Sequence, residues 1–184
     1  MGMEKMEKVQ PAAEEMDKNQ QKVPGRVCLT INGRQITAKE GATILEAARA
    51  EGIDIPTLCY MPGINEIGSC RLCMVEAEGL NSMLAACRTK VTEGMVIRTE
   101  SETLTSFRRT MLRLILANHN VDCMSCPGNG VCRLQELCNA YDVREAGFEG
   151  SRMEMEKTLP LLNDHPYLSY EPGKCIHCQR CISV

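Results

Sequence analysis

The chain has 184 residues, a formal net charge of −3 at pH 7 and 12 cysteines, but only four tyrosines, two phenylalanines and no tryptophan. With so few large aromatic side chains, the modules of such a chain need a source of stability other than a large core. The small net charge and the lack of a basic stripe argue against nucleic acid as the main partner.

Residues 1–24 are polar and charged, and they predict a charged tail without the apolar segment of a secretory signal. The longest apolar helical segment, which starts at Met111, is too short to span a bilayer and contains Arg113. We therefore expect a cytoplasmic protein with no direct membrane insertion, in a compartment where thiols stay reduced. In that compartment, repeated C-x2-C pairs favour metal sites over disulfides.

Residues 27–38 predict a β-hairpin. The dipeptide Asn32-Gly33 lies between two runs of strand-forming residues, which is the strongest local signal for a two-residue hairpin turn. Cys28 lies between two apolar residues of the first strand, so we expect it to be a buried packing thiol and not a ligand.

A short helix is expected after the hairpin. Thr43 and Glu46 have the spacing of a capping box, and Gly52 is the expected C-terminal cap. The apolar positions of this helix are Ile44, Leu45, Ala47 and Ala48. Short strands are expected at residues 74–77, 83–85 and 96–99, and with the hairpin and the helix they indicate a β-grasp sheet.

Four cysteines that follow this helix are spaced C-x10-C-x2-C-x13-C and predict an iron–sulfur site. They are Cys59, Cys70, Cys73 and Cys87. The C-x2-C pair lies on one tight loop, and the outer two cysteines approach from segments on either side. Two irons bridged by two sulfides need four thiolate ligands, and Gly63 and Gly68 would let the main chain come close to such a cofactor.

From about Ser101 the apolar residues take helical spacing. Five of them are expected on one face, namely Leu104, Phe107, Met111, Leu114 and Ile115. Arg108, Arg109 and Arg113 are expected mostly off that face. The helix leads directly to a second group of residues that can bind a metal.

This second group is spaced H-x3-C-x2-C-x5-C and consists of His119, Cys123, Cys126 and Cys132. Three thiolates and one imidazole so close in sequence can enclose one compact centre. A structural zinc ion is the alternative for these residues, because three cysteines with one histidine form a common zinc site. Cys138 shares one helical face with three apolar residues, so we expect it in the core and in neither site.

A third group ends the chain. After a connecting strap at residues 147–173, Cys175, Cys178 and Cys181 are spaced C-x2-C-x2-C. The bacterial ferredoxin run continues with a further cysteine, which would fall just beyond Val184. We therefore expect an incomplete site whose fourth ligand comes from residues downstream, and a ligand from a partner chain is the less favoured alternative.

These motifs together resemble the iron–sulfur region shared by [FeFe]-hydrogenases, NAD-dependent formate dehydrogenases and the large iron–sulfur subunit of respiratory complex I. The run E-x-G-x-C-R-x-C, which ends at Cys73, and the sequence LQEL after Cys132 carry the resemblance, as does the order of the motifs. It covers about residues 26–184. It implies a [2Fe-2S] cluster on the first group, a [4Fe-4S] cluster with one histidine ligand on the second, and a further [4Fe-4S] cluster completed by residues beyond this chain.

The expected fold class is α+β. A β-grasp [2Fe-2S] ferredoxin-like domain is followed by a small, mainly helical [4Fe-4S] domain with one histidine ligand, and then by a truncated ferredoxin-like segment. The predicted boundaries are a charged tail at 1–24, the β-grasp domain at 25–100, the helical domain at 101–150, and the linker with the incomplete module at 151–184.

No nucleotide-binding, hydrolase or metalloprotease motif is present, so we expect no catalytic residue and no substrate site within these residues. The resemblance implies an electron-transfer module of a multi-subunit NAD(P)-linked oxidoreductase of the hydrogenase or formate dehydrogenase type, electron-bifurcating enzymes included. Such a module relays single electrons between a flavin or ferredoxin partner and a catalytic centre outside this chain. The implied partners are a flavin- and NAD(P)-binding subunit, a catalytic subunit or domain, and soluble ferredoxin.

Two alternatives remain open at the level of the sequence. The chain can be a zinc-binding structural or redox-sensing protein, because three cysteines and one histidine suit zinc. It can also be an autonomous ferredoxin-like carrier, which would act alone with a soluble partner.

Overall fold

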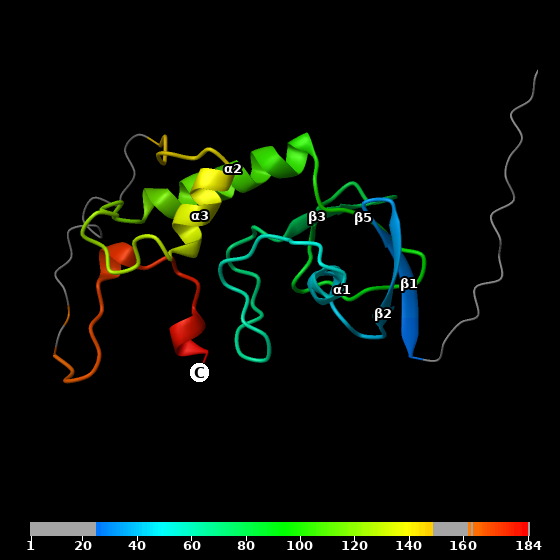
Figure 1. Cartoon of the computed structure of the whole chain (residues 1–184), viewed down its shortest axis with the longest axis horizontal. Coiled ribbons are helices and arrows are strands. Elements are labelled where there is room, and N and C mark those ends of the chain that lie inside the picture. Colours follow the sequence, from blue (N-terminus) through cyan, green and yellow to red (C-terminus); the bar gives the residue numbers. More distant parts are fainter. Residues whose placement is uncertain (1–24, 149–161, 163, 184) are drawn as a thin grey trace, which may run out of the picture.

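The structure is a computed structural model that describes residues 25–148, 162 and 164–183 (Figure 1). The predicted tail and most of the predicted strap lie outside the described residues. Figure 1 shows the strands and α1 (Ile44–Ala50) at one end of the molecule, and α2 (Glu102–Ala117), α3 (Arg133–Ala140) and the C-terminal segment at the other. These two parts are called the sheet region and the helical region below.

The sheet region contains a mixed five-stranded sheet in the order β2-β1-β5-β3-β4. Its strands are β1 (Arg26–Ile31), β2 (Arg34–Lys39), β3 (Met74–Ala77), β4 (Leu84–Ala85) and β5 (Val96–Arg98). β1 runs parallel to β5, and the other neighbouring pairs are antiparallel. The predicted hairpin is confirmed: Asn32 and Gly33 have φ values of 51° and 78°, as a primed two-residue turn requires. The three later strands lie at the predicted positions, two of them one residue shorter than expected.

The capping box at the start of α1 is also confirmed. Thr43 Oγ1 accepts a hydrogen bond from the Glu46 backbone N–H at 3.2 Å, and Glu46 Oε2 accepts one from the Thr43 N–H at 2.7 Å. The C-cap is Glu51, one position earlier than predicted, and Gly52 follows it with φ +73°. The helix buries its apolar residues against the sheet, in a core that also contains Cys73 and Cys87.

Cys28 does not lie in that core. The alternation along β1 turns Val27, Leu29 and Ile31 inward, so Cys28 and Thr30 point to the opposite face and are only half-buried. The expectation of a fully buried packing thiol is therefore wrong, because its apolar neighbours in sequence face the other side of the sheet.

A second core joins the helical region to the sheet region. It is formed by Leu58, Leu72, Leu112, Leu116, Leu134, Leu137, Cys138 and Val143. The first two of these leucines come from the loops that carry the cysteines of the first group, and the others come from α2, α3 and the turn after α3. Cys138 is buried in this core, as predicted.

The buried face of α2 differs from the prediction. Leu104, Arg108, Leu112 and Leu116 are buried, whereas Leu114 is 45% exposed. The buried stripe is rotated around the helix relative to the predicted one, and it includes Arg108, which was expected to lie mostly off the buried face. Its guanidinium donates hydrogen bonds to backbone carbonyls of the sheet region, which makes its burial tolerable.

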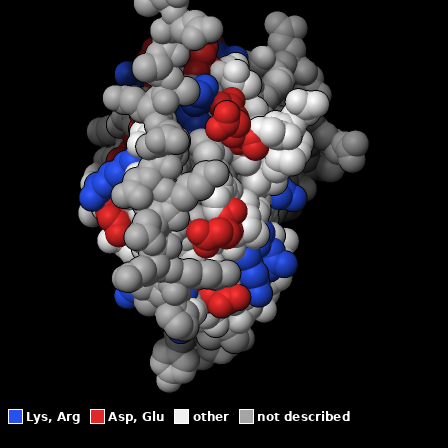
Figure 2. Space-filling model, turned by 90° about the vertical axis from the view of Figure 1, so that its right-hand side faces the viewer, with Lys and Arg blue, Asp and Glu red and all other residues white. Residues whose placement is uncertain are grey.

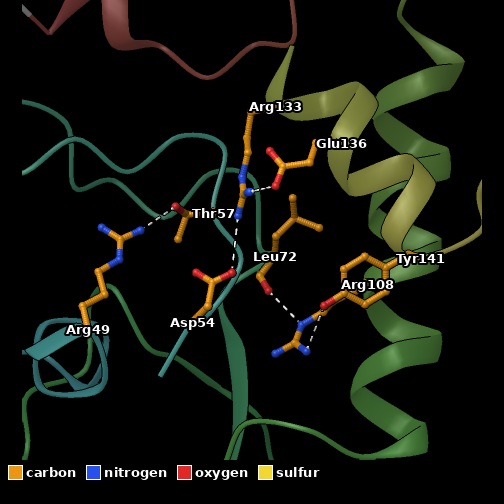
Figure 3. A network of polar contacts seen from close by, with 8 residues as sticks. All are labelled: Arg49, Asp54, Thr57, Leu72, Arg108, Arg133, Glu136 and Tyr141. Carbon is orange, nitrogen blue, oxygen red and sulfur yellow. Dashed lines mark hydrogen bonds and ion pairs between the residues drawn. The ribbon is translucent and has the colours of Figure 1, made fainter. Parts of the chain in front are cut away.

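Among the residues that the structure describes, no helix has the length and hydrophobicity of a transmembrane span. On the face shown in Figure 2, lysine and arginine side chains are interspersed with aspartate and glutamate, and neither sign forms an extended patch on the part not drawn in grey. At the junction of the two regions, Arg133 at the start of α3 forms an ion pair with Asp54 at 3.6 Å (Figure 3).

Candidate iron–sulfur centres

The four cysteines of the first group lie together as two pairs. Cys59 Sγ is 3.4 Å from Cys70 Sγ, and Cys73 Sγ is 3.3 Å from Cys87 Sγ. All four thiols are free, since a disulfide bond is only about 2.05 Å long. Two sulfurs bound to one tetrahedral metal ion at about 2.3 Å lie roughly 3.8 Å apart. Each pair therefore has nearly the spacing of two ligands on one metal ion.

The sheet region holds these cysteines from several directions. The backbone N–H of Ala86 donates to the Cys73 carbonyl at 3.1 Å, and the Leu45 N–H donates to the Ala86 carbonyl at 3.0 Å, so α1 fixes the residue before Cys87. The Leu58 N–H donates to Cys70 Sγ at 3.5 Å. A backbone donor aimed at a ligand sulfur is one of the protein's means of tuning an iron–sulfur cluster.

Gly68 brings the ligand loop against Cys87. Its φ is +71°, and a Cβ placed there would lie 3.5 Å from Cys87 Sγ and 3.2 Å from Arg88 Cγ. Arg71, inside the C-x2-C loop, also has a positive φ of 55°. Gly63 has φ +70° but nothing within 4 Å of an added Cβ, so it serves a turn and not the close approach we expected. Gly68 alone of the two glycines makes room for the site.

Within each pair the hydrogen bond between the two thiols separates their acidities. The hydrogen bond with Cys70 lowers the pKa of Cys59 to about 5, and the hydrogen bond with Cys87 lowers the pKa of Cys73 to about 7. The same hydrogen bonds raise the pKa values of Cys70 and Cys87. Charges on Cys59 and Cys70 raise the pKa of Cys87 further, so the two pairs lie close enough to interact electrostatically. A metal must displace the shared proton of each pair, because thiolates and not thiols are the ligands.

The second group lies around adjoining ends of α2 and α3. His119 follows the C-cap of α2, and Cys132 is the N-cap of α3. The Cys126 N–H donates to the Cys123 carbonyl at 3.3 Å. A Cβ placed on Gly128 would lie 3.7 Å from Cys126 Sγ and 3.9 Å from Cys132 Cβ. The three cysteines thus share one compact loop at the start of α3.

Cys138 lies behind this loop. Burial raises its pKa to about 11, and negative charges on Cys132 and Cys123 contribute to the same shift. A thiol that resists ionisation is a poor ligand, so the protein keeps Cys138 as an apolar packing group.

The third group docks directly on the first. Asn65 Nδ2 donates to the carbonyls of both Cys59, at 2.9 Å, and Cys178, at 2.7 Å. Arg180 donates from Nε to the Cys59 carbonyl at 3.3 Å and from Nη2 to the Tyr60 carbonyl at 3.0 Å. The segment with the last three cysteines therefore packs against the loop that carries Cys59.

The third group also reaches the second. The Asn120 N–H, one residue after His119, donates to the Gly173 carbonyl at 2.5 Å. The His177 N–H donates to Cys175 Sγ at 3.4 Å. No sequence signal indicated Asn65 or Arg180, because both lie between predicted ligand cysteines at positions that the motifs leave unspecified, and each binds a carbonyl more than 110 residues away in the chain.

The donor set of the first group fits an iron–sulfur cluster. The first group offers soft thiolates, three of them almost fully buried, together with a backbone N–H directed at sulfur. Within the described residues, no group of three or more histidine, cysteine, aspartate or glutamate side chains is arranged around a single metal ion.

Comparisons with known proteins find family models that match the part of the chain with the first cysteine group and the part with the second. The family model of the 2Fe-2S iron-sulfur cluster binding domain matches residues 25–102, and that of the NADH-ubiquinone oxidoreductase-G iron-sulfur binding region matches residues 108–146. Among solved structures, the NAD+-reducing [NiFe]-hydrogenase in the H2-reduced state superimposes with a TM-score of 0.77 at 36% identity, over 85% of this chain and 64% of that one.

Curated relatives include three subunits of larger oxidoreductases. The NADPH-Fe(3+) oxidoreductase subunit alpha of Geobacter sulfurreducens is 38% identical over 86% of this chain and 18% of its own length. The NADP-reducing hydrogenase subunit HndD of Solidesulfovibrio fructosivorans is 38% identical over 83% of this chain and 26% of its own. The mitochondrial NADH-ubiquinone oxidoreductase 78 kDa subunit of Candida albicans is 32% identical over 84% of this chain and 21% of its own. The chain thus spans about a fifth to a quarter of the length of these relatives.

Proposed function

We propose, from the premise that this chain belongs to the iron–sulfur subunit family of hydrogenases and NADH-ubiquinone oxidoreductases, that it relays single electrons through clusters held by its cysteines. A [2Fe-2S] cluster is assigned to Cys59, Cys70, Cys73 and Cys87. A [4Fe-4S] cluster is assigned to His119, Cys123, Cys126 and Cys132. Cys175, Cys178 and Cys181 would supply three ligands of a further [4Fe-4S] cluster.

The division of the chain follows from this assignment. Residues 25–100 form the β-grasp domain of the [2Fe-2S] cluster, residues 101–150 form the helical domain of the histidine-ligated cluster, and residues 151–184 form the linker and the incomplete module. The strand order β2-β1-β5-β3-β4 with α1 packed on the sheet supports the first of these domains. The contact of α2 with α3 beside the second group supports the second.

The observation that carries the proposal is the pairing of the four sulfurs of the first group. One tetrahedral ion would gather four sulfurs at equal spacing, whereas a binuclear cluster takes two thiolates on each of its two irons. The separations of 3.3 and 3.4 Å within the pairs, in described residues that contain no group of three or more ligands around one metal ion, agree with the second arrangement. The structure thus favours a binuclear centre over a single zinc ion at this site.

The second core supports a relay between the sites. Cys70 of the first group, Cys132 of the second and Ile176 of the third all pack against the same buried leucines. These contacts place apolar side chains between the cysteine groups, and α2 and α3 contribute most of them. Iron–sulfur clusters supply the one-electron chemistry, and the protein supplies ligands, hydrogen bonds to sulfur and a low-dielectric surrounding.

The reaction of the whole enzyme lies outside these residues. We propose a cytoplasmic oxidoreductase linked to NAD(P), of the hydrogenase or formate dehydrogenase type, in which this region passes electrons between a flavin- and NAD(P)-binding subunit, or ferredoxin, and a catalytic subunit. The relatives that are subunits of NADP-reducing hydrogenase and NADH-ubiquinone oxidoreductase support that setting. No substrate-binding residue is assigned within this chain.

A titration with dithionite tests the proposal. Anaerobically purified protein should be brown, should bleach in the visible range on reduction, and should show two reduced paramagnetic centres with different relaxation behaviour. Reoxidation should restore the spectrum, because a relay must cycle without losing metal. A colourless protein whose zinc content is unaffected by dithionite would support the structural zinc alternative and would refute the relay.

A further inference from the structure

One buried charge lies at the back of the first site. Arg108, on α2, is only 3% exposed, and it is the one charged side chain among the described residues that is buried. Figure 3 shows its guanidinium between Leu72 and Tyr141, at the junction of the sheet and helical regions. Nothing in the electron relay described above uses this residue.

The guanidinium donates hydrogen bonds to the backbone on both sides of a ligand cysteine. Nε donates to the Leu72 carbonyl at 3.1 Å and Nη2 donates to the Met74 carbonyl at 3.0 Å, so the two partners flank Cys73. Nη2 also donates to the Thr99 carbonyl at 2.9 Å, at the end of the sheet. These three bonds fix the position of Cys73 relative to α2.

The fourth polar contact comes from the helical region. Nη1 of Arg108 donates to the Tyr141 hydroxyl at 3.3 Å, and the guanidinium carbon lies 6.0 Å from the centre of the tyrosine ring. Tyr141 is the C-cap of α3. The aromatic face and the carbonyl dipoles stabilise the cation, but none of these partners carries a negative charge.

This burial is costly for a residue with a purely structural role. Within the part of the chain that the structure describes, no carboxylate forms an ion pair with Arg108. Burying a charge without a countercharge is unfavourable on general grounds, and an apolar side chain of similar volume is often equally or more stable in such a place. A negative charge in the neighbourhood of Cys73 would explain why a cation occupies this position.

We propose that Arg108 is the buried countercharge of the first site: it positions Cys73 and raises the reduction potential of the cluster bound there. This inference rests on the proposed function. Four thiolates make a bound [2Fe-2S] cluster anionic, and reduction adds another negative charge. A fixed positive charge in a low-dielectric surrounding therefore favours the reduced state.

The other arginines near the site are less suited to this role. Arg71 and Arg88 neighbour ligand cysteines but are exposed, so water and salt screen their charges. Arg109 is exposed too, although its Nε donates to the Tyr141 carbonyl at 2.9 Å. It therefore provides a matched control: it is the next residue of the same helix, it has the same charge, and it contacts the same tyrosine from the solvent side.

The test is a redox titration of the [2Fe-2S] signal, followed by electron paramagnetic resonance, in the wild-type chain and in the variants Arg108→Gln, Arg108→Met and Arg109→Gln. We expect each neutral variant of Arg108 to lower the equilibrium constant for reduction about tenfold, which is about 59 mV for a one-electron couple. Arg109→Gln should leave the potential unchanged. A potential equal to that of the wild type in a neutral Arg108 variant with an intact cluster would overturn the inference.

Arg108→Lys separates charge from shape. Lysine keeps the positive charge but cannot reproduce the forked bonds to three carbonyls, so thermal stability should fall while the potential stays near that of the wild type. If neither neutral variant folds, this variant decides, and a potential that falls with the stability would refute a role for the charge. A wild-type chain that holds no cluster would remove the proposed function as well, whereas an unshifted potential removes the role of Arg108 alone.

Discussion

Asn65 joins the first and third cysteine groups, and the Asn65→Ala variant should loosen that junction. The side chain is fully buried, with 0% exposure, and its single amide nitrogen donates to the carbonyls of Cys59 and Cys178. Its Oδ1 also accepts a hydrogen bond from Ser183 Oγ at 3.3 Å. Alanine removes all three contacts without adding a new group.

Two of these bonds cross between the segments, but only the one to the Cys178 carbonyl is lost without replacement, because Ser183 Oγ also lies 2.9 Å from the Gln179 carbonyl and can donate its proton there. The size of the effect therefore follows from the bond to Cys178. A hydrogen bond of this kind contributes about 1 kcal/mol net, which corresponds to a roughly fivefold change in an equilibrium constant. The segment should open about fivefold more often but should not detach, because Arg180 keeps its bonds to the carbonyls of Cys59 and Tyr60. The loss of the bond to Cys59 should cost a similar amount inside the sheet region.

Amide hydrogen exchange measures this opening directly, since exchange under native conditions reports the population of locally open states. We expect the peptide that covers residues 172–183 to exchange about fivefold faster in Asn65→Ala than in the wild type. Asn81→Ala, at an exposed position in the turn between β3 and β4, is the matched control and should not change the rate. Equal exchange in Asn65→Ala and Asn81→Ala would show that the amide does not hold the segment.

Three further changes test other parts of the account. Cys70→Ser should abolish the [2Fe-2S] signal and Cys28→Ser should keep it, because of these two cysteines only Cys70 has a sulfur partner at 3.4 Å. If iron analysis finds the full iron content in Cys70→Ser, the ligand assignment is refuted. His119→Cys should keep a four-iron cluster but lower its potential, since an anionic thiolate replaces a neutral imidazole, and an unaltered potential in a redox titration would argue against imidazole ligation. Leu72→Ala should lower the free energy of unfolding by about 2–5 kcal/mol, because the side chain is fully buried between the two regions. Leu80 is 53% exposed, so Leu80→Ala should change the free energy of unfolding by no more than about 0.5 kcal/mol. Equal chemical-denaturation midpoints for the two variants would contradict the packing argument.

The features that the sequence revealed are those whose signals are local. Asn32-Gly33 and the Thr43–Glu46 capping box each depend on residues at most three positions apart, and the structure confirms both. The spacing of the first four cysteines likewise indicated that they converge, and the structure brings them together in pairs. The position of Cys87 in its pair depends on β4, which precedes it, and on α1, whose Leu45 N–H binds the Ala86 carbonyl.

The features that the sequence did not reveal are contacts across long stretches of chain. Arg108 and Leu72 are 36 residues apart, and Asn65 and Cys178 are 113 apart. An arginine in a helical pattern is normally assigned to the solvent face, and only the carbonyls that it binds in the sheet region explain why this one is buried. The position of Cys28 was also not visible in the sequence. A strand turns successive side chains to opposite faces, so Cys28 points away from the core although its two neighbours point into it.

The most direct test of the account is an analysis of iron and acid-labile sulfide in anaerobically prepared protein. We expect iron and sulfide in equal amounts, because both assigned cluster types contain one sulfide for each iron, and we expect a loss of both in Cys73→Ser. Protein that contains zinc or iron without any acid-labile sulfide would contradict the central claim that these cysteines hold clusters for electron transfer.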